Sequence, residues 1–236
     1  MPVHLKREID KLKKHILSLC AIVEESVVRA VKALEERDEE LAKIVVESDI
    51  EIDRREVELE EDVLKALALH QPVAFDLRLI VTVLKINNDL ERIGDLAVNI
   101  AHKAIRLAAA ASPDSPFDFS AMSEAAQAML RDALDAFVRL DVALARRVLQ
   151  RDEEVDGMKQ EARKAIEDKL KDNPDRLPTC LTQLGVARNL ERIADHATNI
   201  AEDVIYMVEG EIVRHRMEEF TPFTQANGER NDNRDS

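Results

Sequence analysis

The chain has 236 residues, of which 45% are hydrophobic, 35% charged and 3% aromatic, with five Gly and no Trp. Strong helix formers dominate this composition, so it favours a helical protein with an aliphatic core and excludes a chain that is disordered throughout. The formal net charge of −14 argues against a nucleic-acid-binding protein, because such a protein needs clustered Lys and Arg to neutralise phosphates.

Apolar residues recur at helical spacing along most of the chain and predict six helices. Pro72 ends the second helix, and the stretch Ser112-Pro113-Asp114-Ser115-Pro116 marks a linker between the third and the fourth. The predicted helices cover residues 5–36, 41–69, 73–111, 119–139, 142–170 and 177–216. We therefore predict an all-α fold of two tandem antiparallel three-helix bundles, with repeats at 1–111 and 117–216 and a disordered polar tail at 217–236.

An internal repeat organises the chain. The stretch Leu90–Ala101 reads LERIGDLAVNIA and returns as LERIADHATNIA at Leu190–Ala201, with nine of the twelve residues identical. Upstream of each copy lies an Asp-x-x-x-Asp pair, at Asp49–Asp53 and at Asp152–Asp156. Repetition of this kind predicts two homologous halves, each with one acidic pair on its second helix and another on its third.

The repeated acidic pairs are candidate metal ligands. Residues four apart on a helix share one face, so the Glu and Asp of each LERI motif lie side by side. If the preceding antiparallel helix faces them, four carboxylates converge in each half, namely Glu91, Asp95, Asp49 and Asp53 in the first and Glu191, Asp195, Asp152 and Asp156 in the second. Hard oxygen ligands of this kind suit Mg, Mn, Ca or ferric iron. The alternative is a solvated polar face that binds nothing.

Two further positions in the motif have structural interpretations. Gly94 and its counterpart Ala194 are small, which is consistent with a close approach of two helices. His196 points about 100° away from Asp195 around the helix. We therefore interpret His196 as a packing or surface residue and not as a metal ligand.

The sequence carries no recognisable catalytic motif. Neither repeat has the Glu-x-x-His pair of a di-iron carboxylate enzyme, and there is no P-loop, dinucleotide-binding fingerprint or zinc-protease motif. We predict that the protein is not an enzyme.

The chain also shows no sign of secretion or of membrane insertion. Cys20 and Cys180 are isolated and fit a reducing compartment. The N-terminus lacks the apolar segment of a signal peptide, and no run approaches the ~18 apolar residues of a membrane span. A cytoplasmic location without direct membrane insertion is predicted.

Three features together resemble the PhoU family of phosphate-uptake regulators: the LERIGD and LERIAD stretches, the two Asp-x-x-x-Asp pairs and the stretch Gln71-Pro72-Val73-Ala74-Phe75-Asp76-Leu77-Arg78. The resemblance covers residues 5–216. It implies two three-helix bundles, a homodimer, and metal ions (Mg, Mn or Fe) bound on the surface by the acidic motifs. It further implies a cytoplasmic negative regulator that links the Pst phosphate ABC transporter, through its ATPase, to the sensor histidine kinase controlling the Pho regulon.

The two halves differ in ways that matter for these implications. Glu56 and Glu60 extend the acidic row of the first half, whereas Lys159 and Arg163 occupy the matching positions of the second. We therefore expect the second site to hold metal more weakly. The second half also lacks the Gln-Pro-x-x-x-Asp-Leu-Arg pattern, so a partner contact at Asp76 and Arg78 is expected only once per chain.

Two other functions stay open from the sequence. One is a related helical protein that stores or buffers metal, or that regulates a different transporter. The other is a structural adaptor whose carboxylate rows bind nothing and serve only to keep it soluble.

Overall fold

The computed structural model describes residues 3–110 and 115–210, and both stretches are helical without any strand. The helices, in chain order, are α1 (Val3–Glu36), α2 (Glu39–His70), α3 (Ala74–Ala108), α4 (Ser120–Arg139), α5 (Val142–Gln150), α6 (Asp152–Asp172), the 3-10 helix η1 (Pro174–Arg176) and α7 (Leu177–Glu209). The predicted tail at 217–236 and part of the predicted linker lie outside the described residues.

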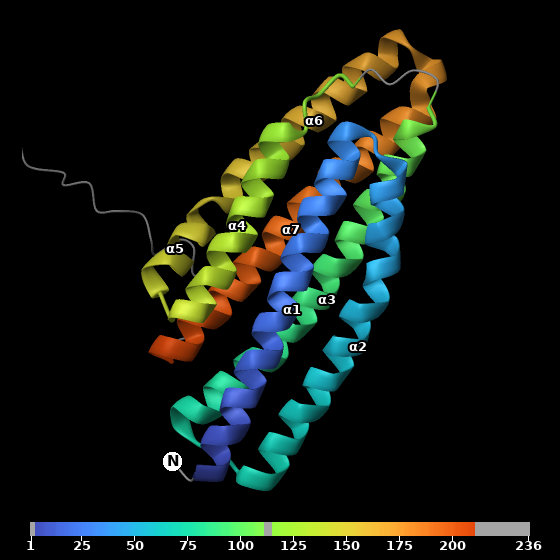
Figure 1. Ribbon diagram of the computed structural model, residues 1–236. Helices are drawn as coiled ribbons and strands as arrows, with labels where there is room; N and C mark the ends of the chain where they lie inside the picture. Colours follow the sequence, from blue (N-terminus) through green and yellow to red (C-terminus); the bar gives the residue numbers. More distant parts are fainter. Residues whose placement is uncertain (1–2, 111–114, 211–236) are drawn as a thin grey trace, which may run out of the picture.

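The helices form two bundles that share a central pair. Helices α1, α2 and α3 make the first bundle, and α4, α5, α6 and α7 make the second (Figure 1). Helices α3 and α7 run antiparallel through the middle of the molecule and pack against each other, so both copies of the LERI motif lie where the halves meet. The all-α prediction of two three-helix bundles is confirmed. Within the described residues, no helix has the length and apolar composition needed to cross a membrane.

The repeated motif supplies the core of each bundle. Leu90, Ile93, Ala97 and Ile100 of α3 are each 0% exposed, and so are their four counterparts in α7. Their spacing of three and four residues places them on one face of the helix. Each large aliphatic side chain buried in this way contributes about 1.5–3 kcal/mol relative to exposure. The carboxylates of the motif are left on the remaining faces.

A second repeated feature fixes where the second helix of each half begins. Asp38 and Asp141 are N-cap residues, and their side chains accept hydrogen bonds from the backbone N–H groups of Leu41 and Leu144, each at 2.9 Å. An N-cap of this kind satisfies one of the unpaired donors at a helix start and contributes about 1 kcal/mol. The repeated Asp-x-x-Leu sequence is therefore a helix-start signal in both halves.

The prediction of one continuous helix at 142–170 is wrong, because the structure divides this stretch into α5 and α6 at Arg151. The Arg151 N–H bonds to the carbonyl of Val148, three residues back, at 3.1 Å, and the Arg151 guanidinium lies 3.3 Å from Asp132 of α4. The three consecutive acidic residues 152–154 that follow favour a new helix N-terminus, where negative charge is stabilised. Asp152 therefore begins a helix, whereas its counterpart Asp49 lies within α2.

The last described helix ends earlier than the predicted residue 216. Gly210 adopts a left-handed conformation (φ 78°), and its N–H bonds to the Tyr206 carbonyl at 2.9 Å. Glycine is the usual residue for such a helix end because it lacks a Cβ. The guanidinium of Arg78, near the start of α3, donates to the Met207 carbonyl at 3.1 Å and lies beside Gly210. Arg78 therefore ties the start of α3 to the end of α7.

Candidate metal centre

The first acidic cluster lies between α2 and α3. Glu91 and Asp95 of α3 lie close enough to Asp49 for all three charges to interact, and Asp53 contributes from the same helix as Asp49. The two helices approach closely here, because a Cβ on Gly94 would lie 3.2 Å from two methyl groups of Ile52 and 3.7 Å from Asp49 Oδ1. The sequence prediction that these two acidic rows face each other is confirmed for the first half.

Repulsion and burial both act on these carboxylates. Burial, followed by the charges of Asp53, Asp95 and Glu91, raises the pKa of Asp49 to about 6. Burial also raises the pKa of Glu91, with the Asp95 charge as the next cause. A raised carboxyl pKa means that the surroundings disfavour the anion. At neutral pH the cluster therefore holds negative charge that a bound cation would stabilise.

Asp49 provides a direct test of whether a cation fits this cluster. Its Oδ1 atom is buried and accepts no hydrogen bond within the described structure. A buried carboxylate oxygen without a partner is costly, and coordination to a hard cation is one way to satisfy it. In their present conformations, however, no three Asp, Glu, His or Cys side chains of the described residues form a ready-made metal site. The donor set, which is all carboxylate oxygen, is of the chemical type that hard cations bind.

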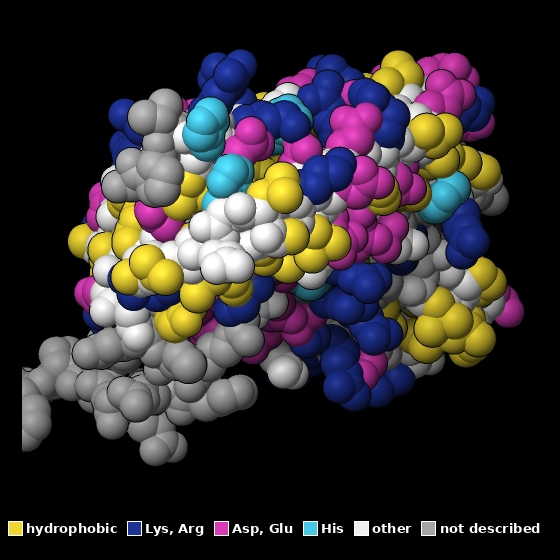
Figure 2. Space-filling model, turned by 90° about the horizontal axis from the view of Figure 1, so that it is seen from below, with side chains coloured by type: hydrophobic (Ala, Val, Ile, Leu, Met, Phe, Trp, Pro, Cys, Tyr) yellow, Lys and Arg dark blue, Asp and Glu magenta, His cyan; other side chains and the backbone are white. Residues whose placement is uncertain are grey.

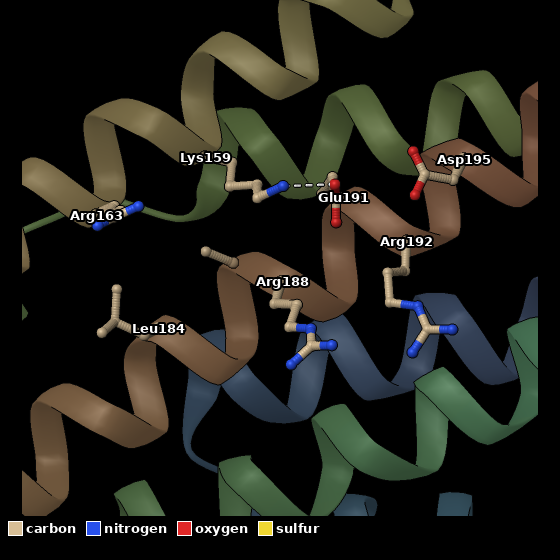
Figure 3. A pocket seen from close by; sticks show the side chains of 8 residues that line it. Lys159, Arg163, Leu184, Arg188, Glu191, Arg192 and Asp195 are labelled. Carbon is tan, nitrogen blue, oxygen red and sulfur yellow. Dashed lines mark hydrogen bonds and ion pairs between the residues drawn. The ribbon is translucent and has the colours of Figure 1, made fainter.

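The second acidic cluster lies between α6 and α7 and contains a built-in cation. Lys159 of α6 donates to Glu191 Oε1 at 2.5 Å (Figure 3). Its Nζ also lies 4.0 Å from Asp156 Oδ1. Burial and the charges of Glu191, Asp152 and Asp156 raise the pKa of Asp195 to about 6, with Lys159 opposing the rise. The acidic rows face each other here as well, and Lys159 pairs with two of the four carboxylates.

A hollow of about 450 Å³ adjoins this second cluster. Figure 3 shows Lys159 and Arg163 reaching toward it from α6, with the Arg188 and Arg192 side chains on α7. Arg163 is held by Glu167 at 2.7 Å. The surroundings of the second cluster are therefore much more basic than those of the first.

Comparison with known proteins identifies the family to which this architecture belongs. The PhoU domain family matches the chain twice, over residues 16–104 and 119–204, which are the two halves of the internal repeat. The chain belongs to the PhoU family. The curated relatives include the phosphate-specific transport system accessory protein PhoU homolog of Pseudomonas putida (40% identical, covering 88% of this chain and 82% of the relative) and PhoU homolog 1 of Thermotoga maritima (35% identical, covering 96% and 97%).

Solved PhoU structures share the same fold. The crystal structure of PhoU from Pseudomonas aeruginosa superposes with a TM-score of 0.84 at 38% identity, covering 87% of this chain and 99% of that one. The phosphate transport system regulatory protein PhoU from Streptococcus pneumoniae gives a TM-score of 0.81 at 29% identity, covering 89% and 99%. The similarity therefore extends over the whole pair of bundles.

The junction of the two halves of this PhoU chain contains polar contacts that sequence reasoning missed. His196 of α7 lies 2.8 Å from Asp89 of α3, and Asn199 donates to the same Asp89 oxygen at 3.3 Å. Both ring and carboxylate are 15% exposed. His196 therefore lies at the junction of the two halves, in contact with a carboxylate of the other half. Its partner could not be found from the sequence, because the two residues are 107 positions apart.

Replacing Asp49 by Asn is expected to raise the free energy of unfolding by about 1 kcal/mol at pH 7 in metal-free buffer. The pKa of about 6 in the folded protein exceeds the ordinary 3.8, so ionisation destabilises the folded state, and stability falls as pH rises from about 4 to about 6. The gain should vanish below pH 4, where Asp49 is protonated in both states. Urea unfolding from pH 3.5 to 7.5 measures it, with the exposed Glu47→Gln as control; a pH-independent difference would contradict the argument.

Proposed function

We propose that this protein is an accessory protein of a phosphate transport system that acts as a negative regulator of phosphate uptake and of the Pho regulon. In this role it links the ATPase of the Pst phosphate ABC transporter to the sensor histidine kinase in the cytoplasm. The observation that carries the proposal is the whole-length similarity to relatives named as phosphate-specific transport system accessory proteins. The duplicated acidic motif lies within the matched residues.

We further propose that metal binding at the acidic motifs is part of this regulation. In the first half, Asp49, Asp53, Glu91 and Asp95 offer only oxygen donors, which suits Mg, Mn or Fe. The buried, unpartnered Oδ1 of Asp49 supports the assignment. Because these carboxylates belong to two helices, a shared cation would hold α2 against α3 and relieve their mutual repulsion. Metal occupancy would then set how firmly α2 is held against α3, the two helices whose connection carries the partner contact proposed below.

The end of the molecule where α2 meets α3 is the proposed contact for the transporter or the kinase. Leu69 and Val73 are 75% and 74% exposed there, and Phe75 is 39% exposed. Figure 2, which views the molecule from this end, shows hydrophobic side chains between charged ones. Arg78 is engaged with α7, so these apolar side chains, and not Arg78, are the proposed contact. Apolar side chains with a polar rim are typical of protein interfaces.

The proposed homodimer would use a different surface. Ile50, Val57 and Leu64 of α2 recur every seven residues and are 75%, 52% and 53% exposed. A seven-residue apolar stripe is typical of a helix that packs against another helix. The stripe is flanked by charges of both signs, such as Arg54 between two Glu residues, so a second copy of α2 can match it. Sedimentation that shows only monomer at micromolar concentration would contradict this part of the proposal.

The functional proposal is tested with a variant that combines Asp49→Asn, Asp53→Asn, Glu91→Gln and Asp95→Asn. We expect it to lose bound metal in elemental analysis and to derepress a phosphate-responsive reporter in phosphate-rich medium, while circular dichroism shows an intact fold. The control removes exposed charges of α2 away from both the acidic cluster and the apolar stripe, as Glu39→Gln and Glu40→Gln. A folded variant that loses its metal but keeps full repression would instead favour metal buffering.

A further inference from the structure

We infer that this protein binds metal in its first half only, because the Lys159 ammonium group takes the place of the metal ion in the second half. The inference rests on the metal binding proposed above and makes it specific. It sharpens the expectation of a weaker second site. Four of the eight predicted ligands, namely Glu191, Asp195, Asp152 and Asp156, are then structural groups.

The internal repeat allows the two clusters to be compared position by position. Lys159 stands where the first half has Glu56, and both residues follow the second Asp of their Asp-x-x-x-Asp pair by three positions. Arg188 likewise stands where the first half has Asn88. The second half therefore gains positive charge on both helices that carry its carboxylates. Lys159 and Arg188 offset two of the four negative charges of the second cluster. In the first cluster the cation nearest the ligands is the exposed Arg92, which pairs with Glu91 and Asp95 at 3.4 Å and 3.9 Å and has Arg192 as its counterpart in the second half.

The position of Lys159 makes this charge effective. Its side chain is 36% exposed, and its Nζ contacts Glu191, whose side chain is only 15% exposed. Figure 3 shows the contact with Glu191 of α7. The same Nζ lies 4.0 Å from Asp156 of α6, so Lys159 joins carboxylates of both helices. A bridge between two helices through oxygen ligands is what a shared cation would provide. Lys159 provides it from within the chain.

The equivalent place in the first half is built differently. Asn87 is fully buried, and its side chain donates to both the backbone carbonyl and the carboxylate of Glu56, at 3.0 Å and 3.1 Å. Asn87 therefore holds Glu56 as an additional acid beside the cluster. In the second half, Ala187 replaces this Asn and lines the hollow beside Lys159. The acid and its support are thus replaced together.

A divalent cation entering the second cluster would meet an ammonium group already bonded to one of its ligands. It would have to break the Lys159–Glu191 ion pair and then lie close to a like charge. We expect at least tenfold weaker binding there than in the first cluster. The first half then responds to metal, whereas the second half keeps its helices joined whether metal is present or not.

The test is the uptake of Mn²⁺ by the full-length protein, measured by equilibrium dialysis and isothermal titration calorimetry. Asp95→Asn is expected to weaken binding at least tenfold, and its counterpart Asp195→Asn is expected to leave binding unchanged. Glu56→Lys should abolish the first site as Asp95→Asn does. Lys159→Glu should create a second site and double the amount of Mn²⁺ bound. Lys159→Gln removes the positive charge without adding a carboxylate, so it should produce a weaker second site.

Several outcomes would overturn the inference. If Asp195→Asn removes half of the bound Mn²⁺, the second half of the parent protein already binds metal. If both Lys159 variants fold but bind no additional Mn²⁺, Lys159 is not what excludes it. A parent protein that takes up no Mn²⁺ would contradict both the inference and the proposed metal binding. Mn²⁺ uptake in both halves would contradict the inference alone.

Discussion

Replacing Lys85 by Met is expected to lower the free energy of unfolding by about 2–4 kcal/mol. Lys85 of α3 lies 2.8 Å from Asp203 of α7, whose side chain is only 2% exposed. Its ammonium group also lies 5.3 Å from the centre of the Tyr206 ring. Removing Lys85 takes away the ammonium group that pairs with this carboxylate at 2.8 Å at the junction of the two halves, and a buried charge that loses such a partner is costly.

The internal repeat supplies a matched control for this prediction. The counterparts of Lys85 and Asp203 are Gly185 and Lys103, and the Lys103 side chain lies over Gly185 without any carboxylate partner among the described residues. Lys103→Met should therefore change stability by less than 1 kcal/mol. A double variant with Lys85→Met and Asp203→Leu should recover much of the loss. Urea unfolding followed by circular dichroism measures all three; equal losses for Lys85→Met and Lys103→Met would contradict the buried-pair argument.

The fold could be predicted because its information is local and repeated. Apolar spacing located the helices, Pro72 located the first sharp connection, and the LERI repeat indicated two similar bundles. The helix break at Arg151 was missed because it depends on a contact with Asp132 of another helix. Apolar spacing continues across such a break almost unchanged, so periodicity could not reveal it.

The sequence indicated which residues form the two acidic clusters, but not all of the contacts that these residues make. Facing rows of carboxylates followed from antiparallel neighbours in each half, and the structure brings all eight residues into two clusters. The sequence also placed Lys159 beside the second cluster, but not its contact with Glu191, because a lysine on a helix surface can equally extend into solvent. The junction of the halves was not predictable, since contacts such as Lys85–Asp203 join residues 118 positions apart.

Ile52→Ala is expected to destabilise the protein by about 3–4 kcal/mol and to weaken Mn²⁺ binding in the first half. The Ile52 side chain is 0% exposed and fills the place where α2 passes over Gly94 of α3. It also lies between Asp49 and Asp53 in the sequence, so it fixes the helix face that carries both carboxylates. Truncation leaves a cavity beneath the cluster and loosens the spacing of its ligands.

The repeat again provides the control, in the form of a size-compensated exchange. The counterparts of Ile52 and Gly94 are Val155 and Ala194, both buried. At this contact the second half therefore has one carbon fewer on α6 and one carbon more on α7. Ile52→Val alone should cost about 1 kcal/mol. Combined with Gly94→Ala it should return to within 0.5 kcal/mol of the parent, because the added methyl group occupies the space that the lost one leaves and alanine is a better helix former than glycine. Additive losses in the double variant, measured by urea unfolding, would show that the close approach at Gly94 is not set by this pair; recovery would show that both halves of the repeat satisfy one packing constraint with different residues.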